Sequence, residues 1–196
     1  MSKAYLLTGP PRIGKTTMIK KIMDVVGRER CGGFYTEEIH IQETRVGFRL
    51  VTLDGKHGIL AHVNAASPLR VGRYGVNLDC LESIGIPAVY TAMATRDLIV
   101  LDEIGPMELY SDRFKSALMD VLNGPRPLLA TIALKSRPWL DAMKQHKRVE
   151  LYTLTLDNRN TLVDTVTHIL HAELNKGIEP DEKASDQCQP EQYDES

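Results

Sequence analysis

Residues 4–17 read AYLLTGPPRIGKTT, and this stretch decides the fold class. Residues 4–8 are an apolar run typical of a short buried strand, and residues 16–26 place apolar side chains at helical spacing up to Gly27. Between the two runs, residues 9–16 fit the phosphate-binding pattern G-x-x-x-x-G-K-[ST]. A strand, a glycine-containing loop and a helix in this order predict an α/β nucleotide-binding domain.

The loop after the first strand is expected to hold phosphate groups. In such loops the backbone N–H groups converge on phosphate oxygens, and the following helix adds the positive end of its dipole. Lys15 would reach the β- and γ-phosphates as a catalytic cation, and the Thr16 hydroxyl would ligate Mg²⁺. The alternative is a structural turn with a helix-capping threonine, and the flanking strand and helix disfavour it. The predicted phosphate-binding residues are Gly9, Pro10, Pro11, Arg12, Ile13, Gly14, Lys15, Thr16 and Thr17.

A second candidate site segment is LIVLDEIG, residues 98–105, in which an apolar run ends in two carboxylates. The continuous apolar run is typical of a parallel strand buried on both faces. At the end of such a strand, Asp102 would hold Mg²⁺ through water, and Glu103 would activate a water molecule as the catalytic base. The two acids alone could equally form a solvated turn, but the phosphate loop upstream favours a site. The predicted nucleotide site therefore includes Leu98, Ile99, Val100, Leu101, Asp102, Glu103, Ile104 and Gly105.

The rest of the chain alternates between strand and helix patterns, which predicts a doubly wound, mostly parallel α/β sheet. Residues 32–76 have β character and a turn at Asp54-Gly55, so we expect a β-hairpin excursion after the first helix. Residues 78–95 have helical spacing that is broken near Gly85 and Pro87. The further expected elements are a helix over 111–122 capped by Ser111, strands over 128–132 and 149–154, and a helix over 160–174.

Two groups of polar residues leave their roles open. Thr131 lies in the strand 128–132 and is either a sensor of the γ-phosphate or a β-branched strand residue without a role in the site. The hairpin excursion also carries charged residues, namely Glu37, Glu38, Arg45, Arg49 and Arg73. Of these, Arg73 could approach the phosphates, but we interpret them as hairpin surface charges.

Composition and charge restrict the function classes. The chain has 196 residues, and its 42% hydrophobic and 26% charged residues are ordinary for a globular protein. No apolar run is long enough to cross a membrane, and residues 1–9 lack a secretory signal, so we expect no membrane partner. The three cysteines are odd in number and share no metal-ligand spacing, which favours reduced thiols and a cytoplasmic location.

The C-terminal segment differs in composition from the rest. Residues 175–196 contain two lysines against seven acids and a single large aliphatic residue, so we expect a disordered acidic tail. Residues 1–174 would then form one P-loop domain, which is only mildly basic. A nucleic-acid partner is therefore unsupported by the charge, and the sequence leaves the oligomeric state open.

Several segments together resemble the small P-loop nucleoside-triphosphatase family, which includes thermophile enzymes and the cancer-related nucleoside triphosphatase. They are GPPRIGKTT, GGFYTEEI, RVGFRLVTLDG, VGRYGV, LIVLDEIGPMEL, LLATI and VELYTLTLDNRNTL, in order over about residues 3–170. The resemblance implies a RecA-like core and Mg²⁺-dependent hydrolysis of ATP, GTP, CTP and UTP to diphosphate and phosphate, with loose base selectivity. It also implies Glu103 as the catalytic acid and a minor site role for Glu108, which could otherwise cap the next helix.

Arg12 departs from the resembled family, which usually has glycine at this position. If the loop needs a positive φ here, arginine costs on the order of 1–2 kcal/mol in strain. The side chain would either point outward, which we favour, or fold over the β- and γ-phosphates as a second cation. We expect retained nucleotide binding with altered turnover.

Three functions fit these residues. The first is nucleoside-triphosphate hydrolysis, which the carboxylate pair favours because it can activate water. The second is a kinase that transfers the γ-phosphoryl group to a nucleotide or small acceptor. The third is a slow nucleotide-dependent switch that binds RNA or protein through the hairpin excursion or tail. Whether an arginine from the same chain or from a second copy assists catalysis stays open.

Overall fold

The computed structural model describes residues 2–175 and contains a sheet flanked by helices. The strands are β1 (Ala4–Thr8), β2 (Cys31–Ile41), β3 (Thr44–Thr52), β4 (His57–His62), β5 (Arg70–Val71), β6 (Tyr74–Val76), β7 (Leu98–Ile104), β8 (Leu128–Ile132) and β9 (Val149–Thr153). The helices are α1 (Lys15–Val26), α2 (Leu78–Cys80), α3 (Ile86–Thr95), α4 (Asp112–Asn123), α5 (Pro138–Lys144) and α6 (Arg159–Asn175). Three short turns complete the order, namely η1 (Arg28–Arg30), η2 (Leu81–Gly85) and η3 (Glu108–Tyr110).

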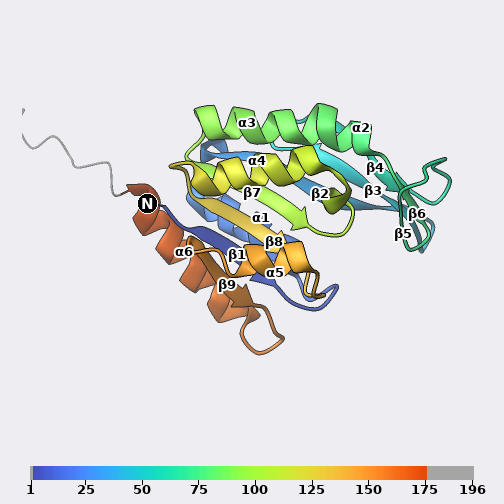
Figure 1. Ribbon diagram of the computed structural model, residues 1–196. Helices are drawn as coiled ribbons and strands as arrows, with labels where there is room; N and C mark the ends of the chain where they lie inside the picture. The colour runs from blue at the N-terminus through green and yellow to red at the C-terminus, as the bar shows by residue number, and fades with distance from the viewer. Residues whose placement is uncertain (1, 176–196) are drawn as a thin grey trace, which may run out of the picture.

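All these strands form one sheet in the order β5-β6-β4-β3-β2-β7-β8-β1-β9 (Figure 1). The half from β2 to β9 is parallel, and the half from β2 to β5 is antiparallel. The expected hairpin excursion is therefore a direct continuation of the parallel sheet. Strand β2 joins the two halves, because Cys31–Tyr35 pair with β7 and Phe34–Ile41 pair with β3.

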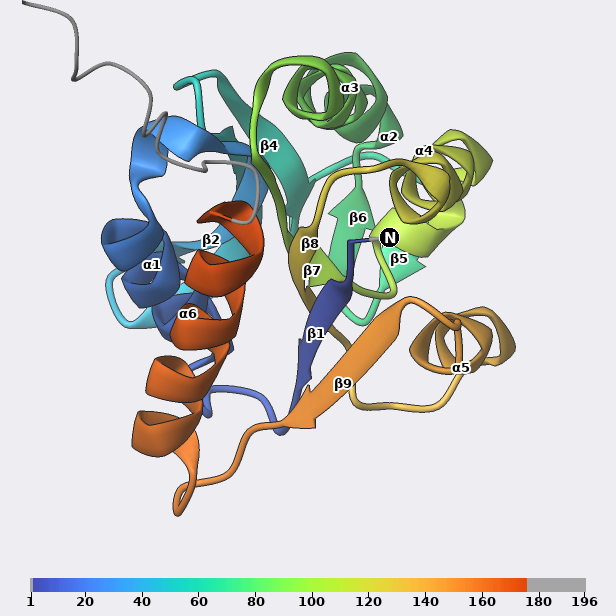
Figure 2. The same ribbon diagram turned by 90° about the vertical axis from the view of Figure 1, so that its left-hand side faces the viewer.

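Helices cover both faces of the parallel half, as a doubly wound fold requires. Figure 2 shows α1 and α6 together on one side of the sheet, with α3, α4 and α5 on the other. Each side has its own buried core: Ile19, Ile22 and Leu170 lie in the first, and Phe34 and Phe114 lie in the second. Burial on both faces explains the continuous apolar runs of β1, β7 and β8.

The prediction that the helix over residues 78–95 is interrupted is wrong, because the chain stays helical throughout this segment. Helices α2 and α3 are joined without interruption by η2, a π-helical turn that ends just before the Ile86-Pro87 pair. Proline lacks the N–H that an α-helix uses, and a wider turn lets the helix continue past it. The sequence patterns also missed α5, a helix of seven residues that starts at Pro138.

Arg148 closes the end of the sheet opposite the phosphate loop. It is 5% exposed, and its guanidinium donates hydrogen bonds to backbone carbonyls from three parts of the chain. The accepting residues are Ser2, Val121, Leu122, Gly124 and Arg126. These bonds satisfy carbonyls at the end of α4, where a positive charge also suits the helix dipole.

Two predictions concern features outside this fold. The predicted acidic tail, apart from Asn175 at the end of α6, lies outside the described residues. None of the helices within residues 2–175 combines the length and apolarity that crossing a bilayer requires.

Candidate nucleotide-binding site

The phosphate loop follows β1 at the carboxyl edge of the parallel strands, where α/β folds bind ligands. Gly9 is buried with φ 153°, and a side chain there would place its Cβ 2.7 Å from the Leu154 carbonyl oxygen. The Leu154 N–H donates a hydrogen bond to the Thr8 carbonyl oxygen at 2.7 Å, so the residue after β9 fixes the start of the loop. Gly14, with φ 107°, precedes the first turn of α1. The loop therefore has the strand-to-helix geometry that the pattern predicted.

Lys15 stands on the first turn of α1 and curls back over the loop. Its Nζ donates to the carbonyl oxygens of Gly9 at 3.1 Å and Pro10 at 3.2 Å. The ammonium group therefore lies on the pocket side of the loop, where it could contact a phosphate oxygen.

Asp102 on β7 is a buried carboxylate with one free oxygen. The side chain is 2% exposed, and Oδ1 accepts a hydrogen bond from the Thr131 hydroxyl on the neighbouring strand β8. Oδ2 is buried without a hydrogen-bond partner among the residues of the described fold. The pKa of Asp102 is raised by burial, although the hydrogen bond from Thr131, the nearby Thr16 and the charge of Lys15 act to lower it. An unpartnered carboxylate oxygen next to a threonine hydroxyl is a suitable start for a metal site.

Thr131 lies behind Asp102 and is fully buried, with 0% exposure. Its hydroxyl is already bonded to Asp102, so any response to the γ-phosphate would pass through that carboxylate. The predicted role as a sensor stays a prediction, and the geometry makes Thr131 a residue that orients Asp102.

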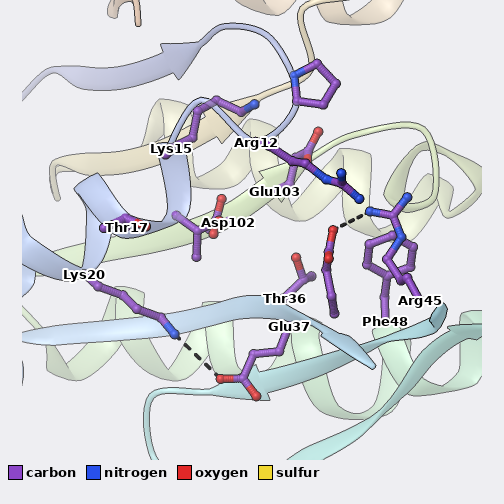
Figure 3. Close-up of a pocket in the computed structure, with 14 residues that line it drawn as sticks. Arg12, Lys15, Thr17, Lys20, Thr36, Glu37, Arg45, Phe48, Asp102 and Glu103 are labelled. Atoms are coloured by element: carbon purple, nitrogen blue, oxygen red, sulfur yellow. Dashed lines mark hydrogen bonds and ion pairs between the residues drawn. The ribbon is translucent and has the colours of Figure 1, made fainter. Parts of the chain in front are cut away.

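Glu103 is half-buried and faces the pocket beside Asp102 (Figure 3). Burial raises the pKa of its carboxyl, the charge of Lys15 lowers it, and the charge of Asp102 raises it again. A carboxylate that holds a proton more readily than usual is a better base for water.

A pocket of about 640 Å³ opens between the phosphate loop and the antiparallel half of the sheet. The loop side provides Pro11, Arg12, Gly14, Lys15, Thr16 and Thr17, and β7 provides Asp102 and Glu103. The opposite wall consists of Lys20 from α1 and residues of β2 and β3, namely Thr36, Glu37, Glu38, Arg45 and Phe48. The structure thus brings the two predicted site segments together on one cavity.

The opposite wall contains charges that sequence reasoning had placed on the surface. Glu37 forms ion pairs with Lys20 at 3.6 Å and Arg49 at 2.8 Å. Arg45 forms an ion pair with Glu38, and its guanidinium carbon lies 4.9 Å from the centre of the Phe48 ring.

These wall residues reach the site because β2 extends past the carboxyl end of β7. Tyr35 is opposite Asp102, and the strand continues for six more residues. The available sequence signal was the strand pattern of residues 34–36 leading directly into two glutamates.

Arg12 has φ 62°, so the loop does impose the left-handed conformation in which family members were expected to carry glycine. Its exposed side chain lines the pocket and runs past Glu103 towards Arg45 (Figure 3). The outward orientation that we favoured is therefore wrong, and Arg12 adds a cation to the cavity.

The apolar part of the second segment does not reach the pocket. Leu98, Ile99, Val100 and Leu101 are at most 1% exposed, and Ile104 is fully buried. The prediction that these residues bind the nucleotide is therefore corrected. Their side chains pack between the sheet and the helices and cannot contact a ligand at the end of the strand. Gly9 is likewise buried and acts through the loop backbone.

Comparisons with known proteins identify the family of this chain. The family model described as NTPase matches residues 4–167. The chain belongs to the NTPase family. A curated relative is the nucleoside-triphosphatase THEP1 of Thermotoga maritima, 41% identical over 172 residues, covering 88% of this chain and 97% of the relative.

Two solved structures of NTPase relatives share the fold. The crystal structure of THEP1 from Aquifex aeolicus has a TM-score of 0.76 and 32% identity, covering 85% of this chain and 98% of that one. The solution structure of a human cancer-related nucleoside triphosphatase has a TM-score of 0.75 and 34% identity, covering 87% and 98%. The predicted P-loop NTPase fold is therefore confirmed.

Proposed function

We propose that this chain hydrolyses nucleoside 5'-triphosphates to diphosphate and phosphate in a Mg²⁺-dependent reaction. The enzyme class, a nucleoside-triphosphatase, follows from membership of the NTPase family. The observation that carries the proposal is the meeting of Lys15, Asp102 and Glu103 on one pocket below a phosphate-binding loop. Tolerance for ATP, GTP, CTP and UTP is part of the proposal and is supported by the family resemblance.

Mg²⁺ fits the residues present. The buried Oδ2 of Asp102 has no partner in the described chain, and Thr16 lies close enough to lower the pKa of that carboxyl. Carboxylate and hydroxyl oxygens are ligands that Mg²⁺ accepts, with water completing the set. Thr16 and Asp102 would therefore hold the ion, which when bound neutralises charge on the β- and γ-phosphates.

The side chains of this chain would divide the reaction between them. The loop N–H groups and Lys15 bind the phosphates and stabilise the charge that develops on their oxygens. Glu103 orients a water molecule whose oxygen forms a bond to the γ-phosphorus while the bond to the β–γ bridging oxygen breaks. The proton of the water passes to the Glu103 carboxylate, whose raised pKa suits it to accept that proton.

Phosphate release from the four nucleotides, with and without Mg²⁺, tests the proposal. We expect Lys15→Ala and Glu103→Gln to lower kcat by at least about 100-fold. Lys21→Ala removes an exposed lysine from the same helix and is the matched control, with activity equal to the parent. Parent-like hydrolysis by both site variants would refute the site assignment.

Phosphoryl transfer to an acceptor other than water is the second candidate. The wall of β2 and β3 gives the pocket space and charge beyond the phosphate loop, where an acceptor hydroxyl could enter. Phosphate release in buffer without any acceptor favours the hydrolase, and a strict acceptor requirement favours the kinase.

Two further predictions stay proposals. They are that residues 1–174 form a single domain and that the protein is cytoplasmic. Limited proteolysis tests the first, because a single domain would survive as a stable fragment without internal cleavage.

A further inference from the structure

Glu108 is a buried carboxyl group that lies near Glu103, the proposed catalytic carboxylate. It begins the turn η3 after β7, is 4% exposed and does not line the pocket. Its Oε2 accepts a hydrogen bond from the Gly105 N–H at 3.0 Å. This bond ties the start of η3 back to the end of β7.

Gly105 separates two carboxyl groups. A Cβ at Gly105 would lie 3.1 Å from Oε1 of Glu103 and 3.2 Å from Oε2 of Glu108. Both oxygens therefore lie close to the same point, and a methyl group at Gly105 would require one of the two carboxyl groups to move by a few tenths of an ångström. The influences on the Glu103 carboxyl are burial and the charges of Lys15 and Asp102, with no hydrogen bond from a described residue among them. Packing must therefore hold Glu103 in its orientation.

Two neighbouring carboxyl groups with little solvent cannot both ionise easily. Burial first, and then the charge of Glu103, raise the pKa of Glu108 to about 8. The acidic groups that face it are Glu103 and Asp102 on β7, and the N–H groups of Gly105 and of Glu108 itself face it from the turn. Near neutral pH, Glu108 is therefore a neutral acid that packs beside Glu103 without repelling it.

We propose that Glu108 is a positioning residue for Glu103: anchored on the Gly105 N–H, it forms the inner wall that keeps the Glu103 carboxylate directed into the pocket. The inference rests on the proposed hydrolysis, in which Glu103 orients water. It predicts that Glu108 acts on the rate only through Glu103 and contributes little to nucleotide binding.

Three variants test separately the hydrogen-bond acceptor of Glu108, its neutral charge and the space that Gly105 leaves between the two carboxyl groups. Glu108→Leu keeps the bulk and removes the acceptor for Gly105. Glu108→Gln keeps a neutral acceptor and should rescue most of the activity. Gly105→Ala leaves both acids in place and inserts a methyl group between them. The control is Glu82→Gln, a conservative change at a glutamate that bonds to Ser111 outside the pocket.

A double-mutant cycle on kcat and KM for Mg·ATP decides the issue. We expect Glu108→Leu and Gly105→Ala to lower kcat about 100-fold, as a misplaced catalytic group does, with KM changed less than about threefold. Glu108→Gln should recover to within about threefold of the parent at pH 7. Because the effect passes through Glu103, adding Glu108→Leu to Glu103→Gln should lower kcat no further.

Other outcomes would overturn the inference. Parent-like kcat in both Glu108→Leu and Gly105→Ala, or a multiplied loss in the double variant, refutes the positioning role. A loss confined to KM does the same. If Glu103→Gln kept the kcat of the parent, the result would instead refute Glu103 as the base of the proposed hydrolysis. Failure of the proposed function is therefore distinguishable from failure of the positioning role. The parent should also lose kcat above about pH 8, and Glu108→Gln should not; equal profiles would contradict the neutral-acid role.

Discussion

Thr131→Val tests the proposed Mg²⁺ site without changing a residue that would contact substrate. Thr131 is fully buried, and its hydroxyl donates to Oδ1 of Asp102, which leaves Oδ2 free. Valine has nearly the same shape, so the substitution removes the hydrogen bond without opening a cavity. The carboxylate then loses both its fixed orientation and one of the interactions that lower its pKa.

The size of the effect follows from the bond that is lost. A hydrogen bond to a charged group contributes about 1.5–3 kcal/mol, which corresponds to roughly 10–150-fold in an equilibrium constant. Outer-shell partners of metal ligands have a similar influence, about 10–100-fold in metal affinity. We therefore expect the free Mg²⁺ concentration for half-maximal activity to rise about 10–100-fold in Thr131→Val.

The assay is phosphate release at saturating ATP while free Mg²⁺ is titrated. Thr131→Ser keeps the donor and should remain within about threefold of the parent. Thr167→Val is the matched control, because the Thr167 hydroxyl on α6 is buried without a partner in the described chain. A Thr131→Val variant whose Mg²⁺ requirement stays within about twofold of the parent would refute the orientation of Asp102 by Thr131.

Three further predictions concern stability, the phosphate loop and pH. Arg148→Met should lower the free energy of unfolding by about 2–4 kcal/mol in urea titrations, because the carbonyls of the α4 end lose their donor; a change below about 0.5 kcal/mol would contradict this. Arg12→Gly should change nucleotide affinity less than about tenfold and mainly alter kcat, since the loop amides bind phosphate; a gain in affinity of several orders of magnitude would show that the natural loop is defective. The protonated form of Glu108 stabilises the fold below pH 4.5, and this contribution is lost as pH rises through about 8. Thermal unfolding of Glu108→Gln relative to the parent should therefore shift upward from pH 5 to pH 8, and a constant difference would argue against the raised pKa.

Local patterns were sufficient to predict the half of the pocket that holds the proposed catalytic residues. The strand, loop and helix around Gly9 to Thr17 are contiguous, so spacing alone placed Lys15 and Thr16. Asp102 and Glu103 were found because an apolar strand ends in two acids. The same apolar run should have excluded Leu98–Leu101 from the site, because continuous burial on both faces leaves no surface for a ligand.

The opposite wall could not be predicted, because it depends on pairing between distant segments. Glu37, Glu38 and Arg45 look like ordinary hairpin charges in the sequence. They face the phosphate loop only because β2 pairs with β7 and then runs on beyond it. The family resemblance gave Glu108 a minor site role, but nothing local shows that its side chain turns inward towards Gly105.

The continuation of β2 past the parallel sheet divides the pocket into parts with separate origins in the chain. The phosphate loop and β7 carry the residues of the proposed hydrolysis, and the tip of β2 and β3, around residues 36–48, forms the facing surface. Substitutions in that tip can change what approaches the γ-phosphate while Lys15, Asp102 and Glu103 stay untouched. The facing surface and the phosphate-binding side of the pocket can therefore be altered independently, because they come from separate segments of the chain.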